Sequence, residues 1–217
     1  MSILFTVVTG SQAHGLVTPY SDIDRRGVFI STTKELLSIG IHVFEKRQYT
    51  DKVDDVAYEI GKFLYLATKS NPAILEMFLA PIETCTKDGF AVRALFPHVW
   101  SSEGVKNAYL GYSRSQWNRF LHGKETRPSK FAAASVRSLY NAVELLETGS
   151  FTVRIADTEI GETIRLFKDG IFGHEEFREM KEHWETKLKK AYEENPHKET
   201  DMEAVNEVLL KLRQEYW

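Results

Sequence analysis

The sequence predicts an α+β protein, with a small mixed β-sheet in its first part and a C-terminal helical bundle after it. Apolar, β-branched runs that suit strands are concentrated in the first 60 residues. From Glu59 onward the apolar residues recur at helical spacing instead. A short piece at residues 151–154 is the one later strand signal, so the chain does not alternate strands and helices as a repeating βαβ fold does.

The expected strands differ in how clearly the sequence marks them. The first is an apolar run that Gly10 closes with a tight turn. The four strands are expected at residues 3–9, 23–31, 41–49 and 53–58, with a short helix at 33–38. After a helix that begins near Ile60 and ends before Asn71-Pro72, further helices are expected at about 73–80, 87–96, 103–122, 129–148, 158–168, 174–194 and 201–215. The pattern changes support one domain over residues 1–100 and a helical domain over 101–217.

Size, charge and cysteine usage exclude several classes of protein. A chain of 217 residues buries a sizeable core, and no apolar run approaches the ~20 residues that span a membrane. The net charge of −3 argues against a protein that coats nucleic acid, although a local basic patch remains compatible with it. Cys85 is the single cysteine, so we expect no intramolecular disulfide and a reducing, cytoplasmic setting.

Two carboxylates close to one strand are the first chemical signal. Asp22 and Asp24 are two residues apart, so in a strand both side chains project from the same face. Burying such charges without partners costs several kcal/mol per ion, on the order of the usual desolvation penalty. Arg25 and Arg26 are one source of compensation; one or two Mg²⁺ ions, which prefer carboxylate oxygens, are the other.

A Gly-Ser turn directly after the first strand is the second signal. Backbone N–H groups at such a turn bind phosphate, and Gly10 has no Cβ to block the approach. The Ser11 hydroxyl adds one donor, while His14 in the same turn is interpreted as a surface residue. A phosphate-binding turn beside a metal-binding carboxylate pair is what transfer of a nucleotidyl group requires.

These residues resemble a known family. The segment Gly10-Ser11…Gly15…Ser21-Asp22-Ile23-Asp24 resembles the Gly-Ser…Asp-x-Asp signature of the DNA polymerase β-like nucleotidyltransferase superfamily. The sequence is most similar to the branch associated with RNA repair pathways. That similarity extends over residues 21–30, 62–63, 71–76, 130–137 and 144–149, and more loosely over the tail.

The resemblance implies a third carboxylate on a nearby strand. Asp54 and Asp55 are adjacent, so they face opposite sides of their strand and only one of them can join the pair. The spacing from Asp54 to Tyr58-Glu59-Ile60 matches the branch and favours Asp54. By resemblance, Asp22, Asp24 and Asp54 hold two Mg²⁺ or Mn²⁺ ions, and Asp54 is also the candidate general base.

The resemblance also implies which residues hold the nucleotide. It assigns the NTP to Gly10, Ser11 and Ser21, in a cleft between the two domains. Lys130 and Arg137 are seven residues apart and therefore share a helix face. There they either bind a triphosphate or an RNA backbone, or form a solvated basic face. Between them stands Ala134, where the family often has a histidine; this departure leaves specificity open.

The implied reaction moves an NMP from an NTP to an acceptor hydroxyl and releases pyrophosphate. An RNA 3′ end, for example of tRNA, is the expected acceptor. A protein side chain or a small molecule is the alternative, and a silent nucleotide-binding or antitoxin-like partner is a third. The acidic net charge favours a small or protein acceptor. Basic residues at 106, 114, 119, 124, 127, 130 and 137 favour RNA.

Overall fold

The computed structural model describes residues 1–19, 21–40, 42–50, 53–124 and 126–217. These residues form two compact units. One unit is Met1–Trp100 with Thr200–Trp217, and the other is Ser101–Glu199. Within the described residues, no helix is both long enough and apolar enough to cross a membrane.

A five-stranded mixed sheet forms the centre of the first unit, as the sequence predicts. Its strand order is β3-β4-β2-β1-β5. Strand β1 (Ser2–Thr9) is antiparallel to both β2 (Ile23–Ile30) and β5 (Ile82–Cys85). Strand β4 (Val53–Glu59) is parallel to β2 and antiparallel to β3 (Glu45–Thr50). Strand β5 was not predicted, because its four residues are largely exposed and carry no apolar alternation.

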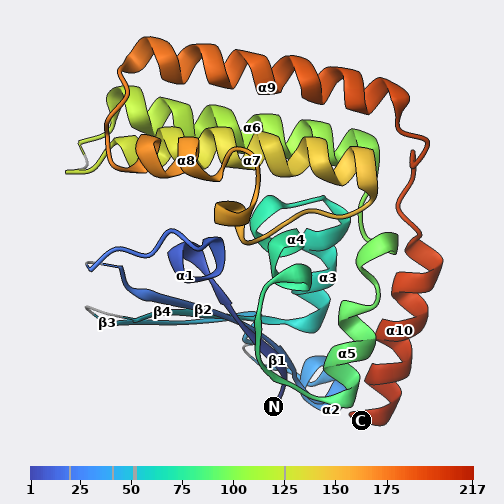
Figure 1. Ribbon diagram of the computed structural model, residues 1–217. Coiled ribbons are helices and arrows are strands. Elements are labelled where there is room, and N and C mark those ends of the chain that lie inside the picture. The colour runs from blue at the N-terminus through green and yellow to red at the C-terminus, as the bar shows by residue number, and fades with distance from the viewer. Residues whose placement is uncertain (20, 41, 51–52, 125) are drawn as a thin grey trace. The chain divides into compact units, whose positions relative to one another are not determined.

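Helices cover one face of this sheet (Figure 1). The rings of Phe5 on β1 and Phe63 pack edge to face, at 5.7 Å between ring centroids, and Phe63 stacks on Phe78 at 4.9 Å. These contacts bury the apolar sides of two helices against the sheet. The helices of the first unit are α1 (Gly10–His14), α2 (Thr33–Leu37), α3 (Ile60–Thr68), α4 (Pro72–Leu79), α5 (Lys87–Arg93), the 3₁₀ turn η1 (Phe96–His98) and α10 (Met202–Glu215).

Helix α10 packs with the sheet unit, against α3, α5 and η1. The division expected from the sequence places residues 201–217 in the helical domain instead. The Arg213 guanidinium lies 2.7 Å from the carboxylate of Glu59, which is only 1% exposed. The Tyr216 hydroxyl donates to Asp88 at 2.8 Å, and its carbonyl accepts from the Thr33 amide at 2.8 Å. Because these partners are distant in sequence, helical periodicity alone could not assign α10 to a unit.

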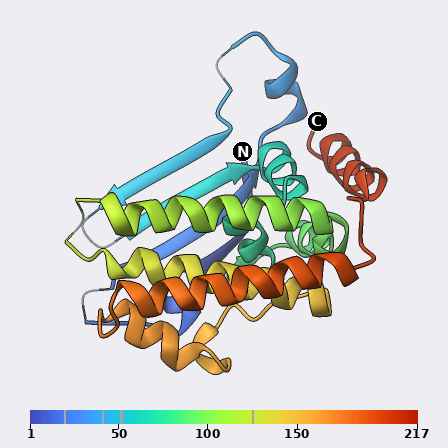
Figure 2. The same ribbon diagram turned by 90° about the horizontal axis from the view of Figure 1, so that it is seen from above.

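The second unit is a helical bundle, as predicted. Helix α7 (Ser129–Thr148) packs against α6 (Ser102–His122), α8 (Gly161–Lys168) and α9 (His174–Glu194). Figure 2 shows α6, α7 and α9 running alongside one another. A buried hydrogen bond of 2.7 Å joins the hydroxyls of Ser113 and Ser135, so small side chains bring α6 and α7 close together. Residues 151–154, expected to be extended, form no strand and lead into the 3₁₀ turn η2 (Ile155–Asp157).

Candidate active site

The Gly-Ser turn and the second carboxylate of the Asp-x-Asp segment lie together in the structure. Strand β1 ends at Thr9, which is paired with Asp24 across the sheet. The next residue, Gly10, has a φ of +62° and begins α1. A Cβ on Gly10 would lie 1.8 Å from a carboxylate oxygen of Asp24. With the Asp24 carboxylate in this position only glycine fits, because the carboxylate occupies the space that a Cβ would take.

Asp22 and Asp24, two of the three predicted metal ligands, differ in exposure. Asp24 is partly buried within β2, and the Thr9 hydroxyl donates to its backbone carbonyl at 3.3 Å. Asp22 is exposed and precedes the first residue of β2. Asp24 therefore lies at the turn with part of its surface covered, whereas Asp22 is open to solvent.

Strand register bears on the choice between Asp54 and Asp55. In the parallel pairing of β2 with β4, Asp54 is the partner of Asp24 and Asp55 is the partner of Arg25. Paired residues of neighbouring strands share a face of the sheet, so the register groups Asp54 with Asp24. The Asp54 side chain lies outside the described residues, and its role as third carboxylate stays a prediction.

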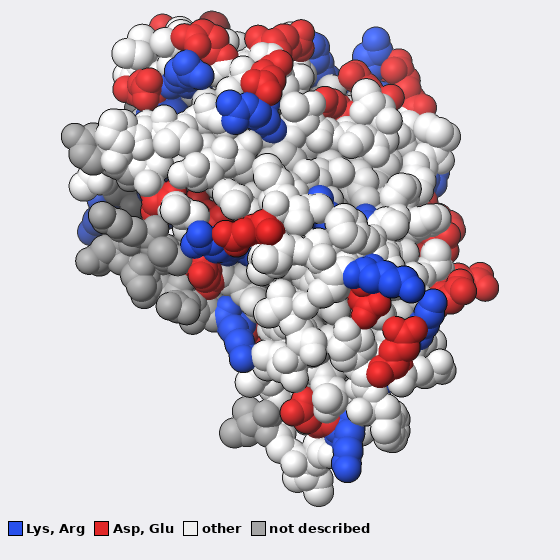
Figure 3. All heavy atoms as spheres, turned by 60° about the horizontal axis from the view of Figure 1, so that its bottom comes forward, with Lys and Arg blue, Asp and Glu red and all other residues white. Residues whose placement is uncertain are grey.

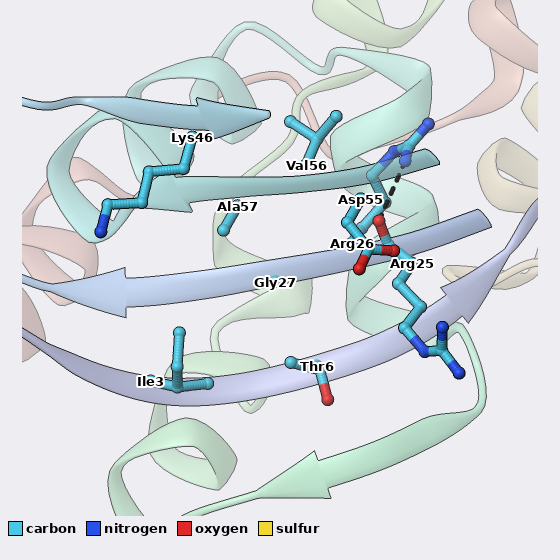
Figure 4. Close-up of a pocket in the computed structure, with 9 residues that line it drawn as sticks. All are labelled: Ile3, Thr6, Arg25, Arg26, Gly27, Lys46, Asp55, Val56 and Ala57. Atoms are coloured by element: carbon cyan, nitrogen blue, oxygen red, sulfur yellow. Dashed lines mark hydrogen bonds between the residues drawn. The ribbon is translucent and has the colours of Figure 1, made fainter. Parts of the chain in front are cut away.

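Asp55 lines a hollow of about 450 Å³ on the other face of the sheet. Figure 4 shows it at one end of this hollow beside Arg25 and Arg26, with Lys46 at the opposite end. One Asp55 carboxylate oxygen is buried and has no hydrogen-bond partner within the described residues. Among the side chains that the structure describes, which exclude that of Asp54, no group of three or more His, Cys, Asp or Glu is arranged to hold a metal ion.

Arg25 and Arg26 extend in different directions (Figure 4). The Arg25 Nε donates to both carboxylate oxygens of Glu83, at 2.8 and 3.0 Å. This hydrogen bond and the charge of Glu83 raise the pKa of Arg25 above its ordinary value. The Arg26 guanidinium donates to the backbone carbonyl of Arg25 at 2.9 Å. Arg25, one of the two arginines proposed as partners for Asp22 and Asp24, therefore pairs with Glu83 on β5.

His14 is buried, so its interpretation as a surface residue is wrong. Its Nε2 lies 3.0 Å from a carboxylate oxygen of Glu76 on α4, and the two residues are 7% and 8% exposed. This contact fixes the short helix α1, and with it the Gly10-Ser11 turn, to α4. Sequence reasoning missed the pair because 62 residues separate its members; the one available signal was the place of Glu76 within the similar segment 71–76.

The other predicted nucleotide-binding residues are in three different settings. Ser21 closes the loop before β2, where its hydroxyl accepts from the Thr18 amide at 2.9 Å. The Ser11 carbonyl accepts from the Leu16 amide at 2.9 Å, which closes α1. Lys130 and Arg137 belong to the second unit and occupy the less buried side of α7. Binding of nucleotide by these residues, and the cleft between domains, stay predictions.

Comparison with known proteins places these features in context. The chain matches the model of the RNA repair pathway DNA polymerase beta family over residues 1–211. It is 26% identical over 129 residues to an uncharacterized 38.9 kDa protein of Enterobacteria phage T4, a match that covers 51% of this chain and 36% of that protein. The chain therefore spans about a third of that relative's length. A nucleotidyltransferase-like protein from Exiguobacterium sibiricum aligns over 99% of this chain and 74% of its own, at 11% identity and a TM-score of 0.30.

Proposed function

Because the chain belongs to the RNA repair pathway DNA polymerase beta family, and is thus a polymerase β-like nucleotidyltransferase, we propose that it transfers an NMP to an RNA 3′ end. The observation that carries the proposal is the Asp24 carboxylate set against Gly10. It places the acidic group beside the turn that the family resemblance assigns to the triphosphate.

The proposed reaction is a displacement at the α-phosphorus of the NTP. The oxygen of the acceptor hydroxyl forms a bond to that phosphorus, and the bond from phosphorus to the bridging oxygen of the leaving group breaks. Pyrophosphate leaves with the bonding electrons, and the hydroxyl proton passes to a carboxylate, for which Asp54 is the candidate. Gly10 and Ser11 hold the polyphosphate, and the His14–Glu76 contact keeps their turn in place.

The donor set suits Mg²⁺ or Mn²⁺. Asp22 and Asp24 carry carboxylate oxygens on either side of Ile23, the first residue of β2, and Asp54 is the backbone partner of Asp24. Two ions held by these carboxylates would supply positive charge to the transferred phosphate and to the attacking oxygen. Without such charge, carboxylates next to a triphosphate would repel it, and this supports metal dependence.

The test incubates the protein with each α-labelled NTP, Mg²⁺ or Mn²⁺, and unfractionated tRNA. We expect label in RNA with the wild type, and a loss of at least about 100-fold for Asp22→Ala combined with Asp24→Ala, the scale of removing an essential electrostatic group. The fold should persist, as judged by circular dichroism. Full activity of this double variant would refute the proposal.

Asp54 and Asp55 offer a matched pair of controls. Asp54→Asn should remove transfer, whereas Asp55→Asn, which removes one charge from the other face of the sheet, should retain it. The opposite result would assign the third carboxylate to Asp55.

The acceptor is tested in the same reaction. If the label appears in protein, or in small molecules from a lysate, the acceptor is a protein side chain or a small molecule and not RNA. NTP binding without transfer to any fraction would support a silent partner.

A further inference from the structure

Positive charge is concentrated in one stretch of the chain. Residues 104–143 contain seven lysines and arginines and one acidic residue, Glu125, although the whole chain has a net charge of −3. The remainder is therefore clearly acidic. Helices α6 and α7 account for most of this stretch, and they pack against each other in the second unit.

A shallow hollow of about 580 Å³ lies on an exposed side of α6. Gly111, Arg114, Asn118 and His122 line it, together with Ser115 and Arg119, and these residues define the α6 hollow. Their spacing of three or four residues puts them on one face of the helix. No carboxylate lines the hollow, and Arg114 makes no ion pair within the described residues.

Gly111 leaves the helix backbone bare inside this hollow. Glycine in a helix interior is unfavourable by about 1 kcal/mol relative to alanine. A Cβ on Gly111 would have no atom within 4 Å, so packing inside the chain does not require glycine here. Glycine does allow a partner to approach the backbone closely.

On helix α9 and on one further face of the protein, acidic side chains lie among the basic ones. On α9, Lys181 lies 2.7 Å from Glu185, and Lys190 lies 3.8 Å from Glu194. On the described part of the face drawn in Figure 3, lysine and arginine are interspersed with aspartate and glutamate. A polyanion therefore meets, at Arg114 in the α6 hollow, a positive charge that has no ion pair within the described residues, in contrast to these surfaces.

We propose that the α6 hollow binds the phosphodiester backbone of the RNA acceptor. Arg114 supplies a guanidinium for phosphate oxygens, and Asn118 and Ser115 supply the amide and hydroxyl donors that accompany it in such contacts. Arg119, which also lines the hollow, lies over the Phe131 ring, 3.9 Å from its centroid, and this contact restricts the position of a second cation. The inference rests on the proposed function for its choice of RNA.

Direct binding tests the proposal independently of catalysis. The probe is a fluorescently labelled single-stranded oligoribonucleotide, whose binding is measured by fluorescence polarisation at 50 and 200 mM salt. Unfractionated tRNA is added as the unlabelled competitor. Arg114→Glu should weaken binding at least 10-fold. The matched control Arg165→Glu makes the same charge change on α8, next to Glu162, and should change affinity less than 3-fold. Equal weakening by both variants would overturn the proposal.

Gly111 separates a binding role from a structural one. Gly111→Ala should raise the melting temperature and leave RNA binding within about 3-fold, whereas Gly111→Gln should weaken binding without lowering the melting temperature. Unchanged binding of Gly111→Gln would contradict close approach of RNA. If polyglutamate displaces the RNA probe as well as unlabelled RNA does, the hollow recognises acidic polypeptide and the proposal fails.

The Asp22→Ala/Asp24→Ala variant distinguishes this inference from the proposed function. It should bind RNA normally while it transfers no nucleotide. Wild-type transfer to RNA with undiminished binding of Arg114→Glu would refute the α6 hollow alone. Arg114-dependent RNA binding without transfer of label to RNA would refute the proposed reaction alone.

Discussion

Substitution of Gly10 by alanine tests the link between the turn and the carboxylate. A non-glycine residue in the left-handed region costs about 1–2 kcal/mol, and Gly10 has a φ of +62°. The new Cβ would also lie 1.8 Å from the Asp24 carboxylate, where real contacts are not shorter than 3.0 Å. The carboxylate is the end of a flexible side chain, so it can rotate away. We therefore expect the protein to fold and the carboxylate to move by at least about 1 Å, a displacement that costs on the order of 100-fold in rate.

Gly149 provides the matched control. It ends α7 with a φ of +80°, and a Cβ there would meet no atom within 4 Å. Gly149→Ala therefore carries the same backbone strain without a carboxylate. Both variants should lose about 1–2 kcal/mol of unfolding free energy in urea denaturation, and only Gly10→Ala should lose transfer of α-labelled nucleotide. A Gly10→Ala protein with wild-type activity, or equal activity losses in the two variants, would refute the reasoning.

Two further predictions concern buried contacts of the first unit. Arg213→Met leaves the Glu59 carboxylate buried without its cation, and should cost roughly 3 kcal/mol of stability in thermal or urea unfolding. Adding Glu59→Gln should restore part of it, and a loss below about 1 kcal/mol would show that solvent already compensates the carboxylate. His14→Ala releases α1 from Glu76. It should raise the KM for NTP under conditions in which the protein remains folded, as judged by its melting temperature. His14→Gln, which keeps a hydrogen-bond donor, should bring the KM for NTP back toward that of the wild type. If side chains with a donor do not restore the KM, His14 does not act by positioning the turn.

Local patterns predicted most elements of the fold. The long helices are marked by apolar periodicity and by flanking signals: the Asn71 side chain accepts from the Ala73 and Ile74 amides at the start of α4, and Gly149 ends α7 in the left-handed conformation. Strand β5 carried no such signal. It forms because its edge position gives hydrogen bonds to β1, a contact between segments about 80 residues apart.

The same distinction applies to the candidate site. The glycine, serine and aspartates of the turn were readable from the sequence, because their spacing resembles the family signature. The pairs His14–Glu76 and Arg25–Glu83 were not, since each joins residues more than 55 positions apart. Sequence thus identifies the groups expected to do chemistry, while tertiary contacts determine which groups hold them.

The discontinuous first unit has a consequence for how the chain folds. Residues 101–199 interrupt it, so its two pieces must meet across a loop of about a hundred residues, and closing a flexible loop of that length costs conformational entropy. The bundle holds its own two ends together, because the Ser102 amide donates to the His197 carbonyl at 2.8 Å. Just beyond, the Asp201 amide donates to the His98 carbonyl at 2.9 Å. If the bundle folds first, its joined ends replace the long loop by a short one. The residues of α10 then start close to the other piece of the first unit, and the entropic barrier to completing that unit is lower.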